Sequence, residues 1–178
     1  NYYYVAVFLI NEITQRLHFK DSTGSDKSER PDFERVNHPG FALGEHMIGY
    51  VAENGLELIA NDVSKEPRYK EVDSLPDTKS EVVIPLKVEN HMIGVLDVQS
   101  NQPSAFDEDD LLVLRTLANN IAIAIENTRL FHRVKIRADQ LTTVSEVSRA
   151  ITQILDIDQL IQRIVSLIHK RFGFPFVH

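Results

Sequence analysis

The first third of the chain predicts strands on either side of one helix. Residues 2–11 are aromatic and β-branched, which is typical of a buried strand, and residues 16–21 predict the strand that returns after a turn. Apolar residues at helical spacing predict a helix over 45–54, which Gly55 ends, and residues 56–60 predict a further short strand.

A hairpin follows at residues 80–100. Alternation along its first strand places four apolar side chains on one face: Val82, Ile84, Leu86 and Val88. On its second strand, alternation predicts one face with Met92, Leu96 and Val98 and another with Ile93 and Val95. Because both faces are apolar, both must be covered by other elements.

The second half of the chain predicts helices. Asp107 is a good N-cap, and Phe106 with Leu111 forms a hydrophobic staple around it. Neither proline nor glycine interrupts the chain from Asp107 to Lys170. A second capping box at Asp156 divides this stretch into a long helix and a shorter one.

The long helix carries a seam of residues at heptad spacing. The seam positions are Ile123, Asn127, Leu130, Val134, Arg137, Leu141, Val144, Ser148, Ile151 and Leu155. Three of these ten positions are polar, so the coil is weak by itself. The pattern fits a weak coiled coil that changes register, and it equally fits a helix that packs on another domain.

Composition narrows the class of protein. The chain has 178 residues, 43% hydrophobic and 25% charged, which is the range of a globular domain. Its net charge of −7 disfavours a nucleic-acid-binding surface. No apolar run reaches the ~20 residues that span a bilayer, so no membrane contact is expected from this segment. Zero cysteines exclude disulfides, a thiol nucleophile and cysteine-ligated zinc.

The C-terminal residues repeat the chemistry of the first strand. Residues 174–177 (FPFV) align without gaps on residues 2–5 (YYYV), and an amphipathic helix over 157–172 precedes them. This order predicts the opening of a second copy of the first domain.

Four segments together resemble a GAF domain. They are residues 4–11 (YVAVFLIN), 43–69 (LGEHMIGYVAENGLELIANDVSKEPRY), 80–100 (SEVVIPLKVENHMIGVLDVQS) and 103–131 (PSAFDEDDLLVLRTLANNIAIAIENTRLF). Residues 145–177 also resemble the first helix and first strand of another GAF domain.

The resemblance implies an α+β fold, with a GAF-like antiparallel sheet that carries helices on both faces and is followed by a long exit helix. It implies three regions. Residues 1–131 are a GAF domain lacking its first helix, residues 132–155 are a signalling helix, and residues 156–178 begin a second, truncated GAF domain. GAF domains are sensors in signalling proteins, joined to kinase, cyclase, phosphodiesterase or transcriptional output modules. A sensor histidine kinase of a two-component system, or a cyclase, is one such context.

The family binds its ligands between the sheet and the segments that cover it. By position, the resemblance implies six ligand-binding residues: Phe41, Ile48, Asp62, Tyr69, Glu81 and Val83. The alternative is that these side chains fill a small core and bind nothing. No metal ligands and no catalytic residues are expected, so the chain is not expected to be an enzyme.

Several known GAF ligands fit the sequence poorly. The cyclic-nucleotide signature has Asn-Lys where this chain has Asn101 and Gln102, and Phe106 with its following acids is explained by helix capping. Covalent bilin and the free methionine sulfoxide reductase version of the fold both use cysteines, which are absent.

Histidines give two further alternatives. Haem would need an axial ligand such as His38, His46 or His91, which show no paired metal-ligand spacing. His132 lacks the acidic neighbour and following proline of a phospho-accepting kinase helix, which favours a surface role. The cofactor, if any, is not identified by the sequence.

The sequence therefore predicts a regulatory domain that senses an unknown small molecule and transmits its state through the exit helix. A homodimer through that helix is expected. The predicted location is the cytoplasm, either free or as part of a membrane-anchored signalling protein. The alternative function is a ligand-free dimerisation and spacer module.

Overall fold

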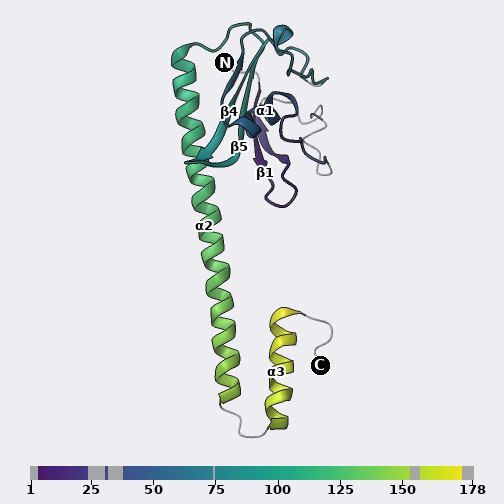
Figure 1. Cartoon of the computed structure of the whole chain (residues 1–178), viewed down its shortest axis with the longest axis vertical. Coiled ribbons are helices and arrows are strands. Elements are labelled where there is room, and N and C mark those ends of the chain that lie inside the picture. Colours follow the sequence, from purple (N-terminus) through teal and green to yellow (C-terminus); the bar gives the residue numbers. More distant parts are fainter. Residues whose placement is uncertain (1–3, 24–30, 32–37, 74, 153–156, 174–178) are drawn as a thin grey trace. The chain divides into compact units, whose positions relative to one another are not determined.

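The computed structural model describes residues 4–23, 31, 38–73, 75–152 and 157–173, with the side chains of 150–152 excepted. These residues form two compact units, residues 1–126 and residues 127–178. The first unit contains the sheet and the start of the long helix (Figure 1). The second contains the rest of that helix and one further helix.

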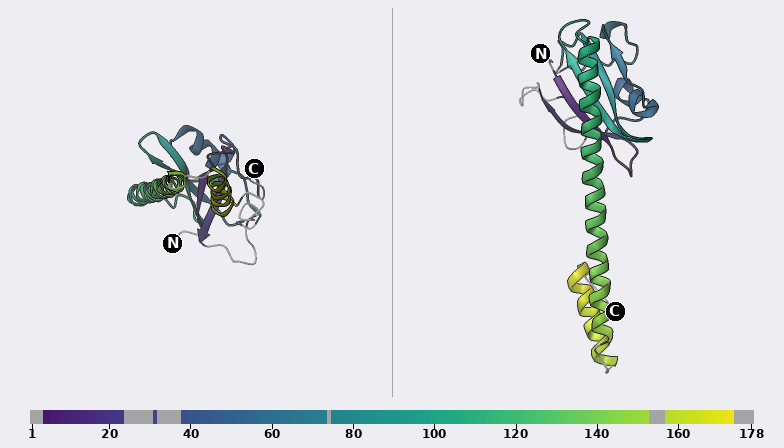
Figure 2. Two further views of the ribbon diagram at one scale, coloured as in Figure 1. Left: turned by 90° about the horizontal axis from the view of Figure 1, so that it is seen from below. Right: turned by 90° about the vertical axis from the view of Figure 1, so that its left-hand side faces the viewer.

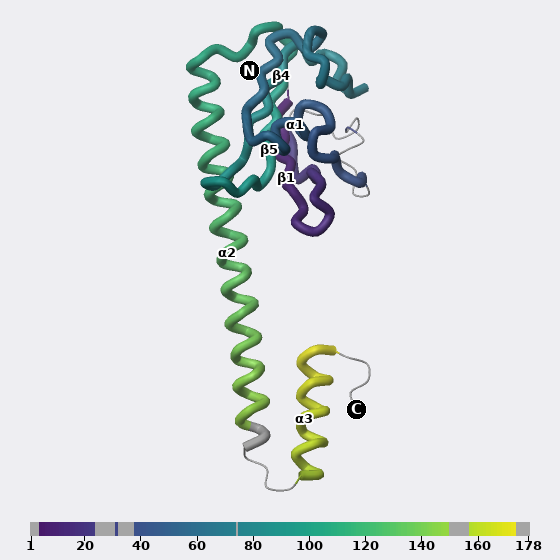
Figure 3. The backbone as a smooth tube through the Cα atoms, viewed as in Figure 1, coloured from purple at the N-terminus to yellow at the C-terminus, as the bar shows by residue number. Residues whose placement is uncertain are grey.

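The first unit is built on a five-stranded antiparallel sheet. Its strands are β1 (Tyr4–Ile10), β2 (Leu17–Thr23), β3 (Leu58–Ala60), β4 (Ser80–Val88) and β5 (His91–Ser100). They lie in the order β2-β1-β5-β4-β3. The strand nearest the N-terminus therefore pairs with β5, about ninety residues later in the chain (Figure 3). This confirms the predicted α+β class with an antiparallel sheet.

Alternation along β1 divides the core between two faces of the sheet. Tyr4, Ala6 and Phe8 point to one cluster of buried side chains, and Val5 and Val7 pack against the other. We name these the α1 face and the α2 face, after the helix that covers each. The strand is apolar on both sides because neither face is left to solvent.

The α1 face is covered by α1 (His46–Asn54) and the segments that follow it. Gly55 ends α1 in the left-handed conformation, with φ of 67°, as the sequence predicted. The stretch after β3 forms only one 3-10 turn, η2 (Val63–Lys65), which Asp62 caps by accepting a hydrogen bond from the Ser64 amide.

The α2 face is covered by the first turns of α2 (Glu108–Thr152) (Figure 2). The Asp110 amide donates to the Asp107 carboxylate at 2.8 Å, which confirms the predicted cap. Phe106 and Leu111 are both buried in the α2-face cluster, as the staple requires. Small residues at Ala118 and Ala122 let the helix lie close to the sheet.

One prediction about the hairpin was wrong. Met92 was expected to share a face with Leu96 and Val98, but it packs in the α1-face cluster, and Ile93 packs in the α2-face cluster. The register changes between Leu86 and the next residue of β4, so that Ile93 is an extra residue on β5. Such a bulge reverses the facing of every residue that precedes it on the strand.

The second unit consists of the remainder of α2 and of α3 (Ile157–Phe172). Within it, the Arg171 guanidinium donates to the Thr143 hydroxyl at 3.0 Å. The predicted cap at Asp156 and the strand over 174–177 lie outside the described residues. The second, truncated copy therefore stays a prediction. None of the described helices is both long enough and apolar enough to span a bilayer.

Candidate functional site

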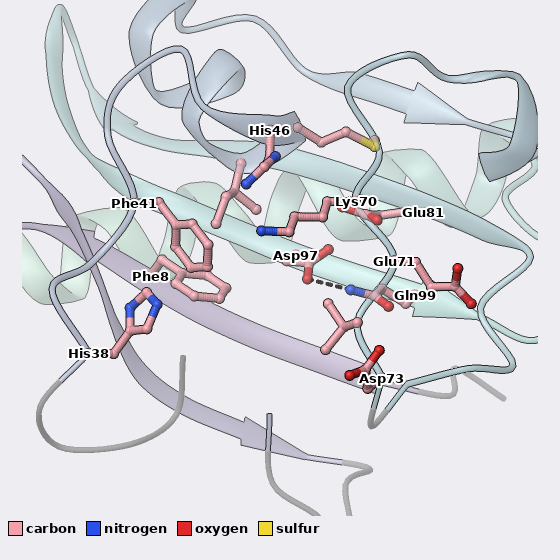
Figure 4. A pocket seen from close by; sticks show the side chains of 13 residues that line it. Phe8, His38, Phe41, His46, Lys70, Glu71, Asp73, Glu81, Asp97 and Gln99 are labelled. Carbon is pink, nitrogen blue, oxygen red and sulfur yellow. Dashed lines mark hydrogen bonds between the residues drawn. The ribbon is translucent and has the colours of Figure 1, made fainter. Parts of the chain in front are cut away.

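A cavity of about 420 Å³ opens on the α1 face of the sheet. Its lining combines aromatic, acidic and basic side chains (Figure 4). The lining residues are Phe8, His38, Phe41, His46, Met47, Ile48, Lys70, Glu71, Val72, Asp73, Glu81, Asp97 and Gln99. Its size falls within the range of small-molecule sites in proteins.

Three polar side chains from the central strands form the floor of the cavity. Glu81 of β4 pairs with Gln99 of β5, and Asp97 lies two residues before Gln99 on the same face of β5. The exposed fractions of Glu81 and Asp97 are only 5% and 3%. Two carboxyl groups are therefore buried side by side in the middle of a sheet.

Burial disfavours the charged forms of these two acids. Burial raises the pKa of Asp97 from 3.8 to about 7, against hydrogen bonds from Gln99 and Glu81 that lower it. Burial also raises the pKa of Glu81 well above its ordinary value, and the negative charge of Asp97 adds to the rise. Near neutral pH the pair therefore holds one proton.

A short hydrogen-bond network orients the floor. The Gln99 amide donates to Asp97 Oδ2 at 2.9 Å, and the Thr78 hydroxyl lies 2.8 Å from Gln99 Oε1 and 3.1 Å from the Leu75 carbonyl oxygen. Asp97 Oδ1 has no hydrogen-bond donor among the described residues, although it is buried. An unpaired buried acceptor is costly, so this oxygen is poised to accept a donor from a ligand.

Aromatic rings form one wall of the cavity. Phe8 packs edge-to-face against Phe19 and Phe41, each with ring centroids 5.9 Å apart. The His38 ring lies 5.1 Å from the Phe41 ring. Edge-to-face packing holds these rings rigidly, which gives the cavity a preformed apolar side.

His46 stands at the start of α1 in a strained backbone conformation, with φ of 55°. Its Nε2 atom is buried without a hydrogen bond among the described residues, and the nearby Glu45 carboxylate lies 3.4 Å away without hydrogen-bond geometry. Burial lowers the pKa of His46, against the charge of Glu45. The ring is therefore a neutral polar group that faces the cavity.

The segment over 69–73 lies across the opening of the cavity. Lys70, Glu71 and Asp73 are exposed there, and Figure 4 shows the Lys70 side chain extending across the pocket. Burial raises the pKa of Tyr69 to about 12, and the negative charge of Glu81 adds to this. These groups make the opening polar while the aromatic wall stays apolar.

The six residues expected to bind a ligand divide into two groups. Phe41, Ile48 and Glu81 line the cavity. Val83 and Tyr69 belong to the α1-face cluster but not to the lining, and Asp62 caps η2 and pairs with Lys65 at 2.8 Å. Whether any of them binds a ligand stays a prediction.

The sequence analysis did not identify the acid that lies beside Glu81 or the aromatic ring of the cavity wall that comes from β1. Asp97, Gln99 and Phe8 were not among the expected residues, yet they line the cavity. One signal was present: Asp97 and Gln99 are polar residues two apart in an otherwise apolar strand, so they must share a face. A polar pair on a buried face of a sheet indicates a site.

The described residues contain no group of three or more His, Asp or Glu side chains placed to hold a metal ion. His38 and His46 both line the cavity, whereas His91 begins β5 at the hairpin turn. The arrangement can accept hydrogen bonds and positive charge at its floor, enclose an apolar group at its wall and exchange a proton between two carboxyl groups.

Comparison with known proteins assigns the family. A family model described as the GAF domain matches residues 4–126, which is most of the chain and nearly all of the first unit. The chain therefore belongs to the GAF domain family.

Two relatives are similar to parts of the chain. The chain is 28% identical over 129 residues to dual 3′,5′-cyclic-AMP and -GMP phosphodiesterase 11A of Takifugu rubripes, covering 68% of this chain and 14% of that protein. It is 40% identical over 67 residues to GAF domain-containing protein A of Dictyostelium discoideum, covering 38% of this chain and 41% of that protein. The chain thus spans less than half the length of either relative.

A solved structure extends the comparison to an enzyme. The free methionine-R-sulfoxide reductase of Neisseria meningitidis, in complex with its substrate, matches with a TM-score of 0.59 and 26% identity, over 72% of this chain and 70% of that one. A GAF-like fold therefore supports catalysis in some proteins, and the fold alone neither assigns an activity to this chain nor excludes one.

Proposed function

We propose that this chain is a regulatory GAF domain that binds a small molecule in the cavity and transmits the bound state through α2. The observation that carries the proposal is that β4 and β5 are shared between the cavity and the α2-face cluster, because each strand contributes side chains to both. Asp97 faces the cavity, while its neighbours Leu96 and Val98 pack in the α2-face cluster. Likewise Glu81 lies beside Val82, which faces α2.

This sharing supplies a physical route from ligand to helix. A ligand that prefers one spacing of β4 and β5 changes the packing of the residues that alternate with its own contacts. The packing of α2 on the sheet then has two arrangements with different ligand affinity, and binding shifts the population between them. A ligand with equal affinity for both arrangements would transmit nothing.

Thermal-shift screening of the whole chain tests the binding half of the proposal. Amines, amino acids, nucleotides, carboxylates and haem are the compounds to screen. We expect one class to raise the melting temperature and a cavity-filling variant, Ile48→Phe, to abolish that rise. The matched control is Leu56→Phe, because Leu56 is exposed and outside the cavity lining.

Hydrogen exchange tests the transmission half. Binding is expected to change the exchange protection of residues 108–126 of α2, which do not line the cavity. Binding that leaves these amides unchanged would count against transmission but not against the cavity. The sensor proposal would be overturned if no compound raised the melting temperature of the wild-type chain.

A second candidate function rests on the exposed seam of α2. Val134, Leu141 and Val144 have exposed fractions of 66%, 70% and 63%, which is high for large apolar side chains. We propose that a second copy of this chain covers them in a parallel homodimer. Dimerisation without a ligand would make the chain a spacer module, and dimerisation with a ligand would carry the sensor's signal onward.

A further inference from the structure

We propose that the ligand of this cavity carries a protonated amine, which binds between Glu81 and Asp97 and displaces the proton that they share, while its apolar part lies against Phe8 and Phe41. This inference rests on the proposed sensor function and names the chemical class of its ligand. The chemistry of the floor and of the aromatic wall specifies that class.

The first observation is the unsatisfied floor. Asp97 Oδ1 is buried, belongs to a cavity-lining residue and has no donor among the described residues. The opposite oxygen, Oδ2, already accepts a hydrogen bond from Gln99. An ammonium group in the cavity would supply up to three donors, one of which this oxygen could accept.

The second observation is the charge of the floor. Among the described residues, the ion pairs formed by lysine and arginine leave Glu81 and Asp97 without a cationic partner. Buried carboxylates are stable only when they are paired with a cation or protonated. A carboxylate or phosphate ligand would face repulsion at this floor, and a neutral hydroxyl would bring no positive charge to replace the proton that the pair holds.

The third observation is the wall beside the floor. Phe8 lies under the cavity from β1, the strand that pairs with β5, and Phe41 packs edge-to-face against it. This wall accepts an alkyl or aromatic group at no cost in unpaired polar atoms. An apolar amine satisfies the floor and the wall together, which an inorganic cation cannot do.

The proton balance follows from the two states of the pair. Without ligand, the pair holds one proton near neutral pH, because burial raises the pKa of both acids. The ammonium enters with all its protons and donates N–H bonds to both carboxylates. The shared proton leaves to water, so binding releases about one proton near neutral pH.

Other titratable groups bear on this balance. His38, His46, Lys70, Glu71 and Asp73 line the cavity. Outside the lining, Glu45 lies beside His46, and Glu66 and Tyr69 interact electrostatically with Glu81. Lys70 is the one lysine or arginine among the described lining residues. It is exposed, and Figure 4 shows its side chain extending across the opening. A matched variant at Lys70 therefore separates its charge from that of the ligand.

Isothermal titration calorimetry on the whole chain tests the inference with matched probes. The probes are 2-phenylethylamine, 2-phenylethanol and phenylacetate, with butylamine, butanol and butyrate as a smaller set. We expect an amine to bind at least about tenfold more tightly than its alcohol and its carboxylate. Titration in buffers with different ionisation enthalpies should report the release of about one proton.

Variants locate the effect. Glu81→Gln and Asp97→Asn should each weaken amine binding by about tenfold or more, because each removes one carboxylate from the ammonium. Asp77→Asn, an exposed carboxylate outside the cavity lining, should bind as wild type. Lys70→Met should bind amines at least as well, because it removes a like charge. Circular dichroism and melting confirm that each variant is folded.

Three outcomes overturn the inference. They are equal binding of amine and alcohol, tighter binding of the carboxylate, and failure of every amine to bind. The first two leave the sensor proposal intact, because a ligand then occupies the cavity without needing a positive charge. Both proposals fail together only if no probe binds in the cavity, that is, if no probe shows binding that Ile48→Phe abolishes.

Discussion

The Arg115 guanidinium of α2 donates to both carboxylate oxygens of Glu57, the residue between the end of α1 and the start of β3. The pair joins α2, the exit helix, to the segment that follows α1, and α1 contributes side chains to the cavity lining. Lys87 of β4 strengthens the same corner by donating to the Gly55 carbonyl oxygen at 2.9 Å. In the proposed transmission, a shift of α1 would therefore have a second route to α2, through Glu57 as well as through the sheet.

Replacement of Glu57 by Gln should weaken the response of α2 more than it weakens ligand binding. The hydrogen bonds from Arg115 lower the pKa of Glu57, so the pair's contribution is present above the ordinary carboxyl range and is lost as pH falls below it. Because the pair is partly exposed, we expect the melting temperature to fall by only a few degrees. Hydrogen exchange of α2 with and without ligand is the informative measurement.

The control for this variant is Glu53→Gln, an exposed carboxylate on α1 that forms no part of the Arg115 pair. It should leave both the melting temperature and the exchange response unchanged. An unaltered response of α2 in Glu57→Gln would show that the sheet alone carries the signal.

Local patterns were sufficient to predict most of the fold. Residues such as Asp107, Phe106 and Gly55 determine helix ends through contacts within a few positions of themselves, so their roles can be read directly from the chain. The facing of Met92 could not be predicted in this way. A bulge depends on how two strands pair, and no residue of β5 alone signals the extra position at Ile93.

The site was harder to predict because its parts come together only through pairing. Glu81 and Asp97 become neighbours through the register of β4 on β5, and Phe8 joins them because β1 pairs with β5. Position within the family was enough to find Glu81 but not its partner. The pKa of Asp97 is a property of that juxtaposition and of burial, which no single segment of sequence contains.

Among the described glycines, Gly94 should tolerate replacement least. A methyl group there would overlap the carbonyl oxygen of Phe8, because β1 and β5 approach closely at this point. We expect Gly94→Ala to cost about 3 kcal/mol in the free energy of unfolding, measured by denaturant titration. The overlap is with backbone, which cannot rotate away as a side chain can.

Gly55→Ala is the matched control, since a methyl group at Gly55 meets nothing within 4 Å but the residue has φ of 67°. Its cost should be about 1 kcal/mol, from the left-handed backbone alone. Equal costs for the two variants would mean that β1 can move away from β5 at Gly94.

Asp97→Asn should remove a pH dependence of stability. The folded-state pKa of Asp97 is raised from 3.8 to about 7, so the folded protein holds this proton more tightly than the unfolded chain. The stabilisation is complete below about pH 4 and is lost as pH rises through about 7. Melting temperatures of wild type should therefore fall across this range relative to those of Asp97→Asn.

Asp77→Asn serves as the control, because the exposed Asp77 side chain makes no contribution to the buried pair. Its melting curve should stay parallel to that of wild type over the same range. A wild-type curve that is also parallel to that of Asp97→Asn would mean that the two buried acids ionise without penalty.

Leu141→Glu should convert the proposed homodimer to a monomer. Leu141 lies on the heptad seam and is 70% exposed in the single chain, so a second copy would bury it and a charge there would be desolvated. Light scattering coupled to size-exclusion chromatography gives the mass directly. Ile136→Glu is the matched control, since Ile136 is 58% exposed but lies off the seam. A dimeric mass for Leu141→Glu, or a monomeric mass for the wild-type chain, would show that the seam does not pair two copies and would favour its packing on another domain.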